Sequence, residues 1–312
     1  MVIGFISNIL KTSRPKQLVK NILVIIPILL SINLWLSQTS EIKFELLLYS
    51  LTGIFSFATS SWMIYIINDF LDIKIDRAHP IKSKRAIASG AVSFRVSVIL
   101  ICTLALLSII SSYFLGIHFL TSVILYQILM ISYCIYLKRI FLLDIFIVSI
   151  GYTLRVFGGA MLLRGIGLIT AQINISIWLY LCTALGSFFV LLIKRSSEIS
   201  NNVIIKRKSI EKYNQSILNK IIIFTEISTY GCYALYCISS PFGFIFKGNT
   251  PENYSLIITL PLVIIGMRRY KITSSLNKLG EHPEEVILKD KILQVTFISW
   301  VILSAALIST IT

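Results

Sequence analysis

An acidic run between residues 68 and 76 is the part of the sequence best suited to chemistry. It reads Asn68-Asp69-Phe70-Leu71-Asp72-Ile73-Lys74-Ile75-Asp76. On an α-helix, Asp69, Asp72 and Asp76 occupy positions i, i+3 and i+7 and share one face. Carboxylates on one face repel one another unless a cation lies between them, and Mg²⁺ takes one or two carboxylates plus waters and substrate phosphates. The run therefore predicts a magnesium site, with Asn68 beside it. The competing interpretation is a solvated acidic helix end.

A basic stretch follows the aspartates directly, since residues 77–90 read RAHPIKSKRAIASG. A diphosphate group needs positive side chains as well as a metal ion to neutralise it. Lys82 and Arg85 are therefore candidates for phosphate contacts. The alternative is that they are ordinary basic residues of a cytoplasmic loop.

Three ionisable residues stand inside apolar segments, where such residues are functional candidates by default. Asp144 and Arg155 are eleven positions apart, which on a helix is about three turns and roughly 16 Å along the axis. They therefore lie on one stripe, and the alternative is a salt bridge to another helix. Glu226 has no visible partner in the sequence, and its role is left open. His118 and His282 stand alone and are expected to have no function.

The composition predicts what positions these residues. Hydrophobic residues make up 56% of the 312 residues, charged residues 14%, and the mean hydropathy is +0.84. Soluble domains carry about 25% charged residues, so we expect an all-α, polytopic membrane bundle in a single domain, residues 1–312. A spanning helix needs about 20 apolar residues. Nine segments, the eighth of them short, approach this length: 20–37, 45–67, 91–115, 117–137, 142–163, 173–193, 219–238, 254–268 and 292–311. Residues 1–10 are expected to form a short interfacial helix, and 239–253 a loop.

The loops between the nine expected spans alternate along the chain between loops rich in Lys and Arg and loops with almost none. With the N-terminus inside, 25 of the 29 Lys and Arg residues fall on one side of the membrane. Cytoplasmic loops are enriched in Lys and Arg, so the sequence predicts a cytoplasmic N-terminus and an acidic run at the cytoplasmic face of the cell (inner or plasma) membrane. The net charge of +15 does not indicate nucleic-acid binding, because the basic residues are divided among five short loops.

The motif NDxxDxxxD at the end of the second span resembles the UbiA superfamily of intramembrane prenyltransferases. Further motifs resemble one branch, the decaprenyl-phosphate phosphoribosyltransferases. These motifs cover residues 14–290 and are Arg14-Pro15-Lys16-Gln17-Leu18-Val19-Lys20-Asn21, HPxKxxRxIASG at 79–90, Tyr136-Leu137-Lys138-Arg139 with Asp144, Leu154-Arg155-x-x-Gly158-Gly159, Lys194-Arg195-x-x-Glu198, and Pro283-Glu284-Glu285 with Leu288-Lys289-Asp290.

The chain departs from this resemblance at two places. The usual RPIASG reads RAIASG at 85–90, which removes a proline but no charge. The superfamily's second acidic motif, DxxxD, is expected after the sixth span, where this chain has Lys194, Arg195 and Glu198. A user of prenyl diphosphate needs carboxylate–metal contacts on both sides of the diphosphate. Lys-Arg in that place favours a second phosphorylated substrate held by cationic contacts.

The resemblance to the phosphoribosyltransferase branch implies a reaction. The 5-phosphoribosyl group would pass from phosphoribosyl diphosphate to a polyprenyl phosphate of the decaprenyl type, with release of diphosphate. Mg²⁺ is the implied cofactor, with Asp69, Asp72 and Asp76 as its ligands. The residues then expected at the substrates are Lys16, Lys20, Lys82, Arg85, Lys138, Arg139, Asp144, Arg155, Lys194, Arg195 and Glu198.

Two other functions are considered. A UbiA-type aromatic prenyltransferase for quinone or haem biosynthesis, using a polyprenyl diphosphate, would share the fold and the first motif, but the missing second acidic motif disfavours it. A transporter of anionic solutes would place charges deep in several helices and show an inverted repeat, and the sequence has neither. The sequence leaves open the polyprenyl chain length and whether the protein forms a homo-oligomer.

Overall fold

The spanning helices form where the sequence is continuously apolar. The computed structural model describes residues 2–169, 173–200, 214–239, 244–246, 254–276 and 283–309. Within these residues, seven helices are long and apolar enough to cross a membrane. They are α5 (Ser40–Leu71), α7 (Phe94–Phe114), α8 (Ile117–Ile135), α9 (Leu143–Gly165), α10 (Ile177–Ser200), α11 (Gln215–Ser239) and α14 (Lys291–Ser309). Each matches one expected span, which confirms the all-helical membrane bundle.

The first expected span is not one continuous helix, so that part of the prediction is wrong. It consists of the 3₁₀-helix η1 (Val19–Ile25) and two short helices, α3 (Ile26–Leu29) and α4 (Ile32–Trp35). Pro27 lies in the first turn of α3, where its missing N–H is tolerated, whereas inside a longer helix it would break a backbone hydrogen bond. Hydropathy alone does not register this break, because proline interrupts a helix without making the segment polar.

Two adjacent glycines of α9 allow close packing, one of them against this broken segment. A Cβ atom on Gly159 would collide with the carbonyl oxygen of Val24 and would lie 2.8 Å from the Val24 carbonyl carbon and 3.2 Å from Cδ of Pro27. On Gly158, a Cβ atom would lie 2.7 Å from Cε2 of Phe57. The backbone of η1 can therefore rest directly on α9 only because Gly159 has no side chain, whereas Gly158 makes room for Phe57 of α5.

Replacing Gly159 by alanine should destabilise the protein by about 1–3 kcal/mol, because the obstructing atoms are backbone and cannot rotate away. The midpoint of thermal unfolding in detergent measures this cost. Gly186→Ala is the matched control, since no atom lies within 4 Å of a Cβ atom built on this other helical glycine. Equal midpoints for the two variants would contradict the proposed close packing.

The eighth expected span is also divided. It comprises the 3₁₀-helix η5 (Ser255–Thr259) and α12 (Leu260–Leu276), and it is followed by the short helix α13 (Pro283–Lys289). Part of the expected loop at 239–253 is a strand, β2 (Phe244–Phe246), which pairs antiparallel with β1 (Ile173–Ile175). The remainder of that loop, 240–243 and 247–253, falls outside the described residues.

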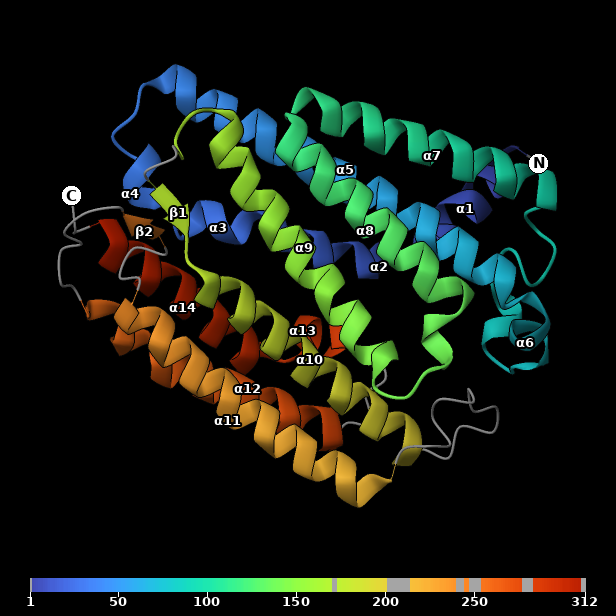
Figure 1. The fold of residues 1–312 in the computed structure, drawn as a ribbon. Coiled ribbons are helices and arrows are strands. Elements are labelled where there is room, and N and C mark those ends of the chain that lie inside the picture. The colour runs from blue at the N-terminus through green and yellow to red at the C-terminus, as the bar shows by residue number, and fades with distance from the viewer. Residues whose placement is uncertain are drawn as a thin grey trace.

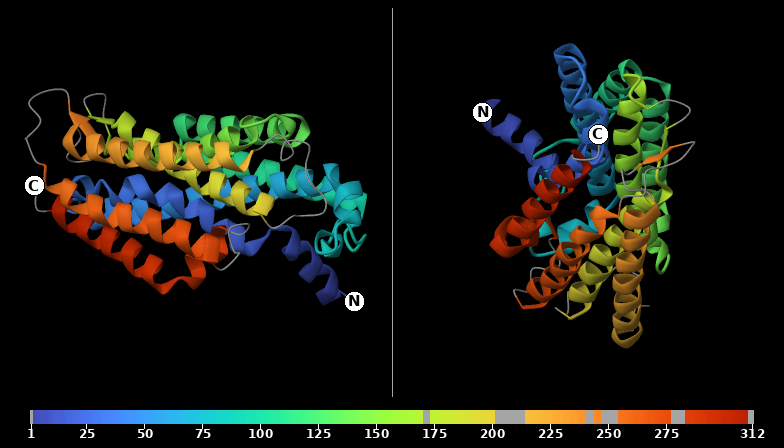
Figure 2. Two further views of the ribbon diagram at one scale, coloured as in Figure 1. Left: turned by 90° about the horizontal axis from the view of Figure 1, so that it is seen from below. Right: turned by 90° about the vertical axis from the view of Figure 1, so that its left-hand side faces the viewer.

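The two ends of the bundle carry different elements. At one end lie the N-terminal helix α1 (Val2–Thr12), which confirms a helix there, and the short helix α6 (Ile73–Ala78) (Figures 1 and 2). The strands β1 and β2 and the C-terminal end of α14 lie at the opposite end (Figure 1). The acidic run is therefore at the α1 end, and hydrogen bonds from Arg85 and Lys138 place η2 (Lys82–Lys84) and η3 (Leu137–Arg139) beside it. The short helix α2 (Pro15–Leu18) follows α1 in the chain.

The interior is apolar, and so is much of the surface. Phe57 lies at the centre, edge-to-face with Phe119 and Tyr126 at centroid distances of 5.7 and 5.6 Å. Large apolar side chains are at least half exposed along the outer faces of the spanning helices, among them Ile99, Leu106, Ile128, Phe224 and Ile302. Such a surface suits hydrocarbon rather than water.

Candidate active site

The acidic run lies where α5 passes into α6. Helix α5 ends at Leu71, and Asp72, with φ −96° and ψ 9°, separates it from α6. Hydrogen bonds of the α-helical type still cross this junction, from Asp72 N to Asn68 O (3.0 Å) and from Asp76 N to Asp72 O (2.8 Å). The run is therefore a bent helix rather than the straight one expected, and its carboxylates divide into two groups.

The first group joins Asp69 and Asp76 through a shared guanidinium. Arg85 Nη1 donates to Asp69 Oδ1 at 3.0 Å and to Asp76 Oδ2 at 2.7 Å. Arg14 also donates to Asp69. Both aspartates are buried, whereas the two arginines are partly exposed. Arg85, which the sequence predicted as a phosphate contact, thus contacts two carboxylates of the acidic run directly.

The second group joins Asn68 and Asp72 through Lys138. The Nζ atom of Lys138 donates to Asp72 Oδ1 at 2.7 Å and to Asn68 Oδ1 at 3.2 Å. Lys138 lies in η3 and is buried. Its neighbour Arg139 is exposed and makes no ion pair with any described residue. Of this expected basic pair, the structure brings only Lys138 to the acidic run.

The oxygen atoms of this site suit Mg²⁺ chemically. Among the described residues, no three Asp, Glu, His or Cys side chains converge on one point as a preformed metal site. Mg²⁺ does not require this, because it usually takes one or two carboxylates and completes its shell with water and substrate phosphates. The oxygens of Asp69, Asp72 and Asp76 already face cationic side chains. They would hold a metal ion that arrives together with a diphosphate.

The N-terminal basic residues contact α13. Lys16 Nζ lies 2.8 Å from Glu285 Oε1, and Lys20 Nζ lies 4.0 Å from Glu284 Oε2. Hydrogen bonds from Lys16 and Lys289 lower the pKa of Glu285 to about 2, and the bond to Glu285 raises the pKa of Lys16 above its usual value. Both predicted lysines therefore lie beside α13, with Lys16 exposed and Lys20 half-buried.

Three of the predicted substrate residues bind one another. Arg195 Nη2 donates to Asp144 Oδ2 at 2.6 Å, and Arg195 also donates to Glu198 one turn further along α10. The Asp144 side chain is fully buried. The alternative interpretation of Asp144, a salt bridge to another helix, is therefore confirmed, although its predicted stripe partner was Arg155.

Lys194, unlike its neighbour Arg195, forms no ion pair with any described residue. It is half-buried, and its charged neighbours include Glu198, Lys20 and Glu284. Lys194 of α10 and Lys20 of η1 are therefore near enough to interact electrostatically. This is the only part of the Lys194-Arg195-x-x-Glu198 motif that the described residues place beside a second predicted phosphate contact.

Arg155 is enclosed in the core. Its guanidinium donates to Asn21 Oδ1 (2.9 Å), Ser61 Oγ (2.9 Å), the Tyr126 hydroxyl (2.8 Å) and Gly151 O (2.8 Å). These neutral acceptors come from η1, α5, α8 and α9, and only 4% of Arg155 is exposed. Its position suits a residue that fixes the helices around the site rather than one that touches a substrate.

The loop that carries Lys82 is anchored at both ends. The Nδ1 atom of His79 accepts hydrogen bonds from the backbone N–H groups of Ile81 (3.2 Å) and Lys82 (3.3 Å). Arg77 Nε donates to Ala88 O at 2.9 Å. These bonds fold residues 79–90 back beside α6, so Lys82 and Arg85 extend from a fixed loop.

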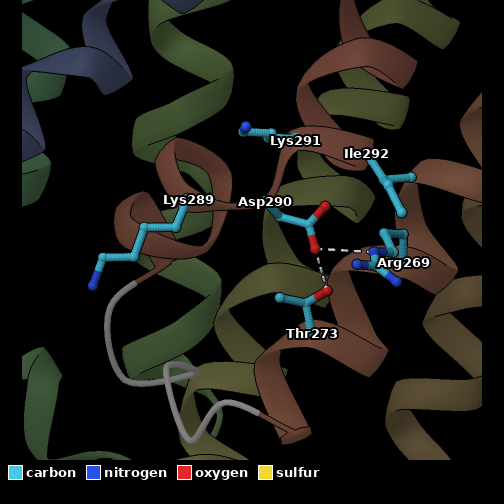
Figure 3. A pocket seen from close by; sticks show the side chains of 6 residues that line it. All are labelled: Arg269, Thr273, Lys289, Asp290, Lys291 and Ile292. Atoms are coloured by element: carbon cyan, nitrogen blue, oxygen red, sulfur yellow. Dashed lines mark hydrogen bonds and ion pairs between the residues drawn. The ribbon is translucent and has the colours of Figure 1, made fainter.

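A pocket of about 270 Å³ lies between α12, α13 and α14 and is lined by several basic residues (Figure 3). Its central Asp290 accepts hydrogen bonds from Arg269 (2.9 Å), Thr273 (2.6 Å) and the Leu293 N–H (2.9 Å). Lys289 and Lys291 extend away from it in Figure 3. Because these positive charges do not converge, the pocket is a helix junction rather than a binding site.

Comparison with known proteins agrees with this geometry. The UbiA prenyltransferase family model matches residues 24–275, which is most of the chain. The chain belongs to the UbiA prenyltransferase family. It is 31% identical over 303 residues to the decaprenyl-phosphate phosphoribosyltransferase of Mycolicibacterium smegmatis (96% of this chain, 91% of that one). It is 30% identical over 301 residues to the enzyme of the same name from Corynebacterium glutamicum (94% and 84%).

Solved structures of UbiA proteins have the same fold. A UbiA homolog from Archaeoglobus fulgidus bound to GPP and Mg²⁺ superposes with a TM-score of 0.69 at 16% identity, covering 97% of this chain and 99% of that one. A digeranylgeranylglyceryl phosphate synthase superposes with a TM-score of 0.64 at 18% identity, covering 98% and 99%. This UbiA protein is therefore a multi-pass membrane protein and a transferase.

Several polar residues of this UbiA protein were not singled out in the sequence. Tyr152, Tyr270 and Ser274 cluster near Lys20 and Glu284, and the sequence carries no signal for them, because tyrosine and serine are common in apolar helices. Glu226, whose role was open, pairs with Lys271 (2.8 Å) and accepts a hydrogen bond from Tyr230 (2.8 Å). Its position therefore suits a structural role. His118 makes no hydrogen bond to any described residue, and His282 lies outside the described residues.

Proposed function

We propose that this UbiA protein transfers the 5-phosphoribosyl group of phosphoribosyl diphosphate to a polyprenyl phosphate and releases diphosphate, with Mg²⁺ as its cofactor. Similarity to the relatives named decaprenyl-phosphate phosphoribosyltransferase supports this activity, because the alignments cover 94–96% of this chain. We further propose that it does so in the cell membrane, with its N-terminus and acidic run on the cytoplasmic side.

The observation that carries this proposal is the charge at the end of α10. Where the superfamily's second acidic motif is expected, the chain has Lys194, which faces Lys20, and Arg195, which is bound to Asp144. The two carboxylates that the described residues place there, Asp144 and Glu198, are both bound by Arg195 rather than arranged as a pair for a second metal ion. Two lysine side chains instead suit direct contact with a phosphate group, and phosphoribosyl diphosphate carries a second phosphate at its 5-position.

The residues then share the chemistry as follows. An oxygen of the acceptor phosphate forms a bond to the anomeric carbon, and the bond to diphosphate breaks with its electron pair going to the leaving group. Bound Mg²⁺ would neutralise charge on that leaving group. Arg85 and Lys138 form ion pairs with the acidic run. They are therefore placed to donate hydrogen bonds to a diphosphate that binds beside these carboxylates. No general base is required, because a phosphate monoester is already anionic near neutral pH.

The two proposed substrates would reach the site from different phases, the acceptor from the bilayer and the donor from water. A polyprenyl phosphate keeps its chain in hydrocarbon and its phosphate at the interface, whereas the sugar donor is soluble and anionic. Basic side chains at the cytoplasmic end of an apolar bundle attract both phosphates. Among them, Lys16 and Lys82 are exposed or half-buried and can meet an incoming ligand first.

A transfer assay tests the proposal. Purified protein receives Mg²⁺, radiolabelled phosphoribosyl diphosphate and polyprenyl phosphate, and we expect label in the organic phase that disappears when EDTA removes the metal. If instead no label appears and a prenyl group passes from polyprenyl diphosphate to an aromatic acid, the protein is an aromatic prenyltransferase and the proposal is wrong.

A further inference from the structure

Three buried polar atoms on α12 and α13 make no hydrogen bond of 3.5 Å or less to any described residue, although two of them, the hydroxyls of Tyr270 and Ser274, are close neighbours. They are the Tyr270 hydroxyl, Ser274 Oγ and Glu284 Oε2. The residues are 4%, 1% and 8% exposed. Tyr270 and Ser274 are four positions apart and so lie on one face of α12. A buried polar group without a hydrogen bond is destabilising, and three together are unusual in a stable interior.

The three atoms belong to one cluster with the two lysines of the site. The polar neighbours of Tyr270 are Ser274, Tyr152 and Glu284. Glu284 Oε2 lies 4.0 Å from Lys20 Nζ, too far for a hydrogen bond. Lys194 has both Lys20 and Glu284 among its charged neighbours. Two ammonium groups, one carboxylate and two hydroxyls from η1, α10, α12 and α13 therefore lie within electrostatic range of one another.

The mixture of charges restricts what this cluster can bind. Lysine side chains attract a phosphate group, but a carboxylate repels one. A carboxylate does accept hydrogen bonds from hydroxyl groups, as acidic side chains do from the ribose of dinucleotides. Only a ligand with both a phosphate and neighbouring hydroxyls satisfies all of these side chains.

We propose that Glu284, Tyr270 and Ser274 bind the sugar hydroxyls of a pentosyl phosphate and thereby exclude a donor whose transferred group is hydrocarbon. The identity of the sugar as the phosphoribosyl donor rests on the proposed function above. A prenyl chain has no hydroxyl group, so it would leave all three atoms without partners. Sites built to bind a hydroxyl reject analogues without it by about 10⁴-fold.

Other buried polar atoms without partners do not form such a cluster. Tyr236 on α11 and Ser304 on α14 also lack hydrogen-bond partners among the described residues. The polar neighbours of Tyr236 are Tyr233, Cys237 and Cys182, with no lysine and no carboxylate among them. These two residues therefore supply matched controls, because they bear the same chemical groups away from the cluster.

The experiment measures ligand binding without turnover. The full-length purified protein is heated with ribose 5-phosphate or with n-butyl phosphate, which has the phosphate but no hydroxyls, and the shift in unfolding temperature gives each affinity. The variants are Glu284→Gln, Tyr270→Phe and Ser274→Ala. The controls are Glu226→Gln, Tyr236→Phe and Ser304→Ala.

Wild-type protein and all three controls should bind ribose 5-phosphate at least tenfold more tightly than n-butyl phosphate. Glu284→Gln should lose most of that preference, since a hydrogen bond to a charged group contributes about 1.5–3 kcal/mol, or roughly 10- to 100-fold. Tyr270→Phe and Ser274→Ala should each lose part of it. A preference unchanged in Glu284→Gln, or equally reduced in the controls, would overturn the inference.

The result can be separated from that of the transfer assay. If wild-type protein transfers the phosphoribosyl group but Glu284→Gln keeps both the preference and the KM for the donor, the proposed function stands and the hydroxyl site fails. If no transfer occurs but the preference exists and depends on Glu284, the hydroxyl site stands and the proposed acceptor is wrong.

Discussion

Replacing Asp72 by asparagine should reduce phosphoribosyl transfer by about a thousandfold while leaving a folded, membrane-inserted protein. Asparagine is nearly the same size and keeps an oxygen that can accept the 2.7 Å hydrogen bond from Lys138. It removes the negative charge that a hard cation needs. The loss should therefore appear in turnover and in the Mg²⁺ concentration required, rather than in the amount of protein recovered from the membrane.

The measurement is initial rate against Mg²⁺ concentration, with unfolding temperature determined on the same preparations. Glu41→Gln is a suitable control, because Glu41 is an exposed carboxylate in the first turn of the same helix, 31 positions before Asp72. This control should retain full activity. Wild-type rates in Asp72→Asn at every Mg²⁺ concentration would show that Asp72 does not bind the metal.

The acidic run is neutralised by its own basic residues. Asp69 contacts Arg14 and Arg85, Asp76 contacts Arg85, and Asp72 contacts Lys138. An uncompensated buried charge is costly, so these pairings allow Asp69 and Asp76 to remain buried, and Asp72 half-buried, before any ligand arrives. Under the proposed function, a metal ion and a diphosphate that arrive together would take over both sets of contacts, because their charges are opposite.

The sequence predicted the fold where the physical signal is local. Seven spans could be located because about 20 consecutive apolar residues are needed to cross a bilayer and little else produces them. The broken first crossing could not be predicted in this way, because its shape depends on Pro27 together with close contact between Val24 and Gly159, 135 positions further along the chain. Contacts between such distant positions leave no periodicity in one sequence.

The same distinction holds for the candidate site. Asn68, Asp69, Asp72 and Asp76 were recognisable because their spacing puts them within two turns of one helix. Lys138 and Arg139 could not be told apart, since which of two adjacent residues faces inward depends on how η3 meets α8. The pairing of Asp144 with Arg195 could not be predicted either, because the two residues are 51 positions apart and their spacing follows no helical period.

That last pair leads to the second large effect. Replacing Arg195 by methionine should destabilise the protein by about 3 kcal/mol, because it removes the guanidinium 2.6 Å from a fully buried carboxylate and leaves that charge in an apolar interior. The double variant with Asp144→Asn should recover most of the loss, since an amide is far less costly to bury than a charge. Thermal unfolding of both single variants, the double variant and the wild type gives the coupling energy directly.

This cycle also separates a structural from a substrate-binding role. If the pair only holds α9 against α10, the double variant should regain both stability and a near-normal KM for each substrate. If Arg195 binds a substrate phosphate, as the sequence motif suggested, the double variant should be stable but should still bind that substrate at least tenfold more weakly.

Lys194→Met should weaken phosphate binding under either outcome with little loss of stability, because Lys194 is half-buried and none of its described carboxylate neighbours is close enough to form an ion pair with it. The two adjacent basic residues of α10 would then have different tasks, with Arg195 fixing the helix and Lys194 meeting the ligand.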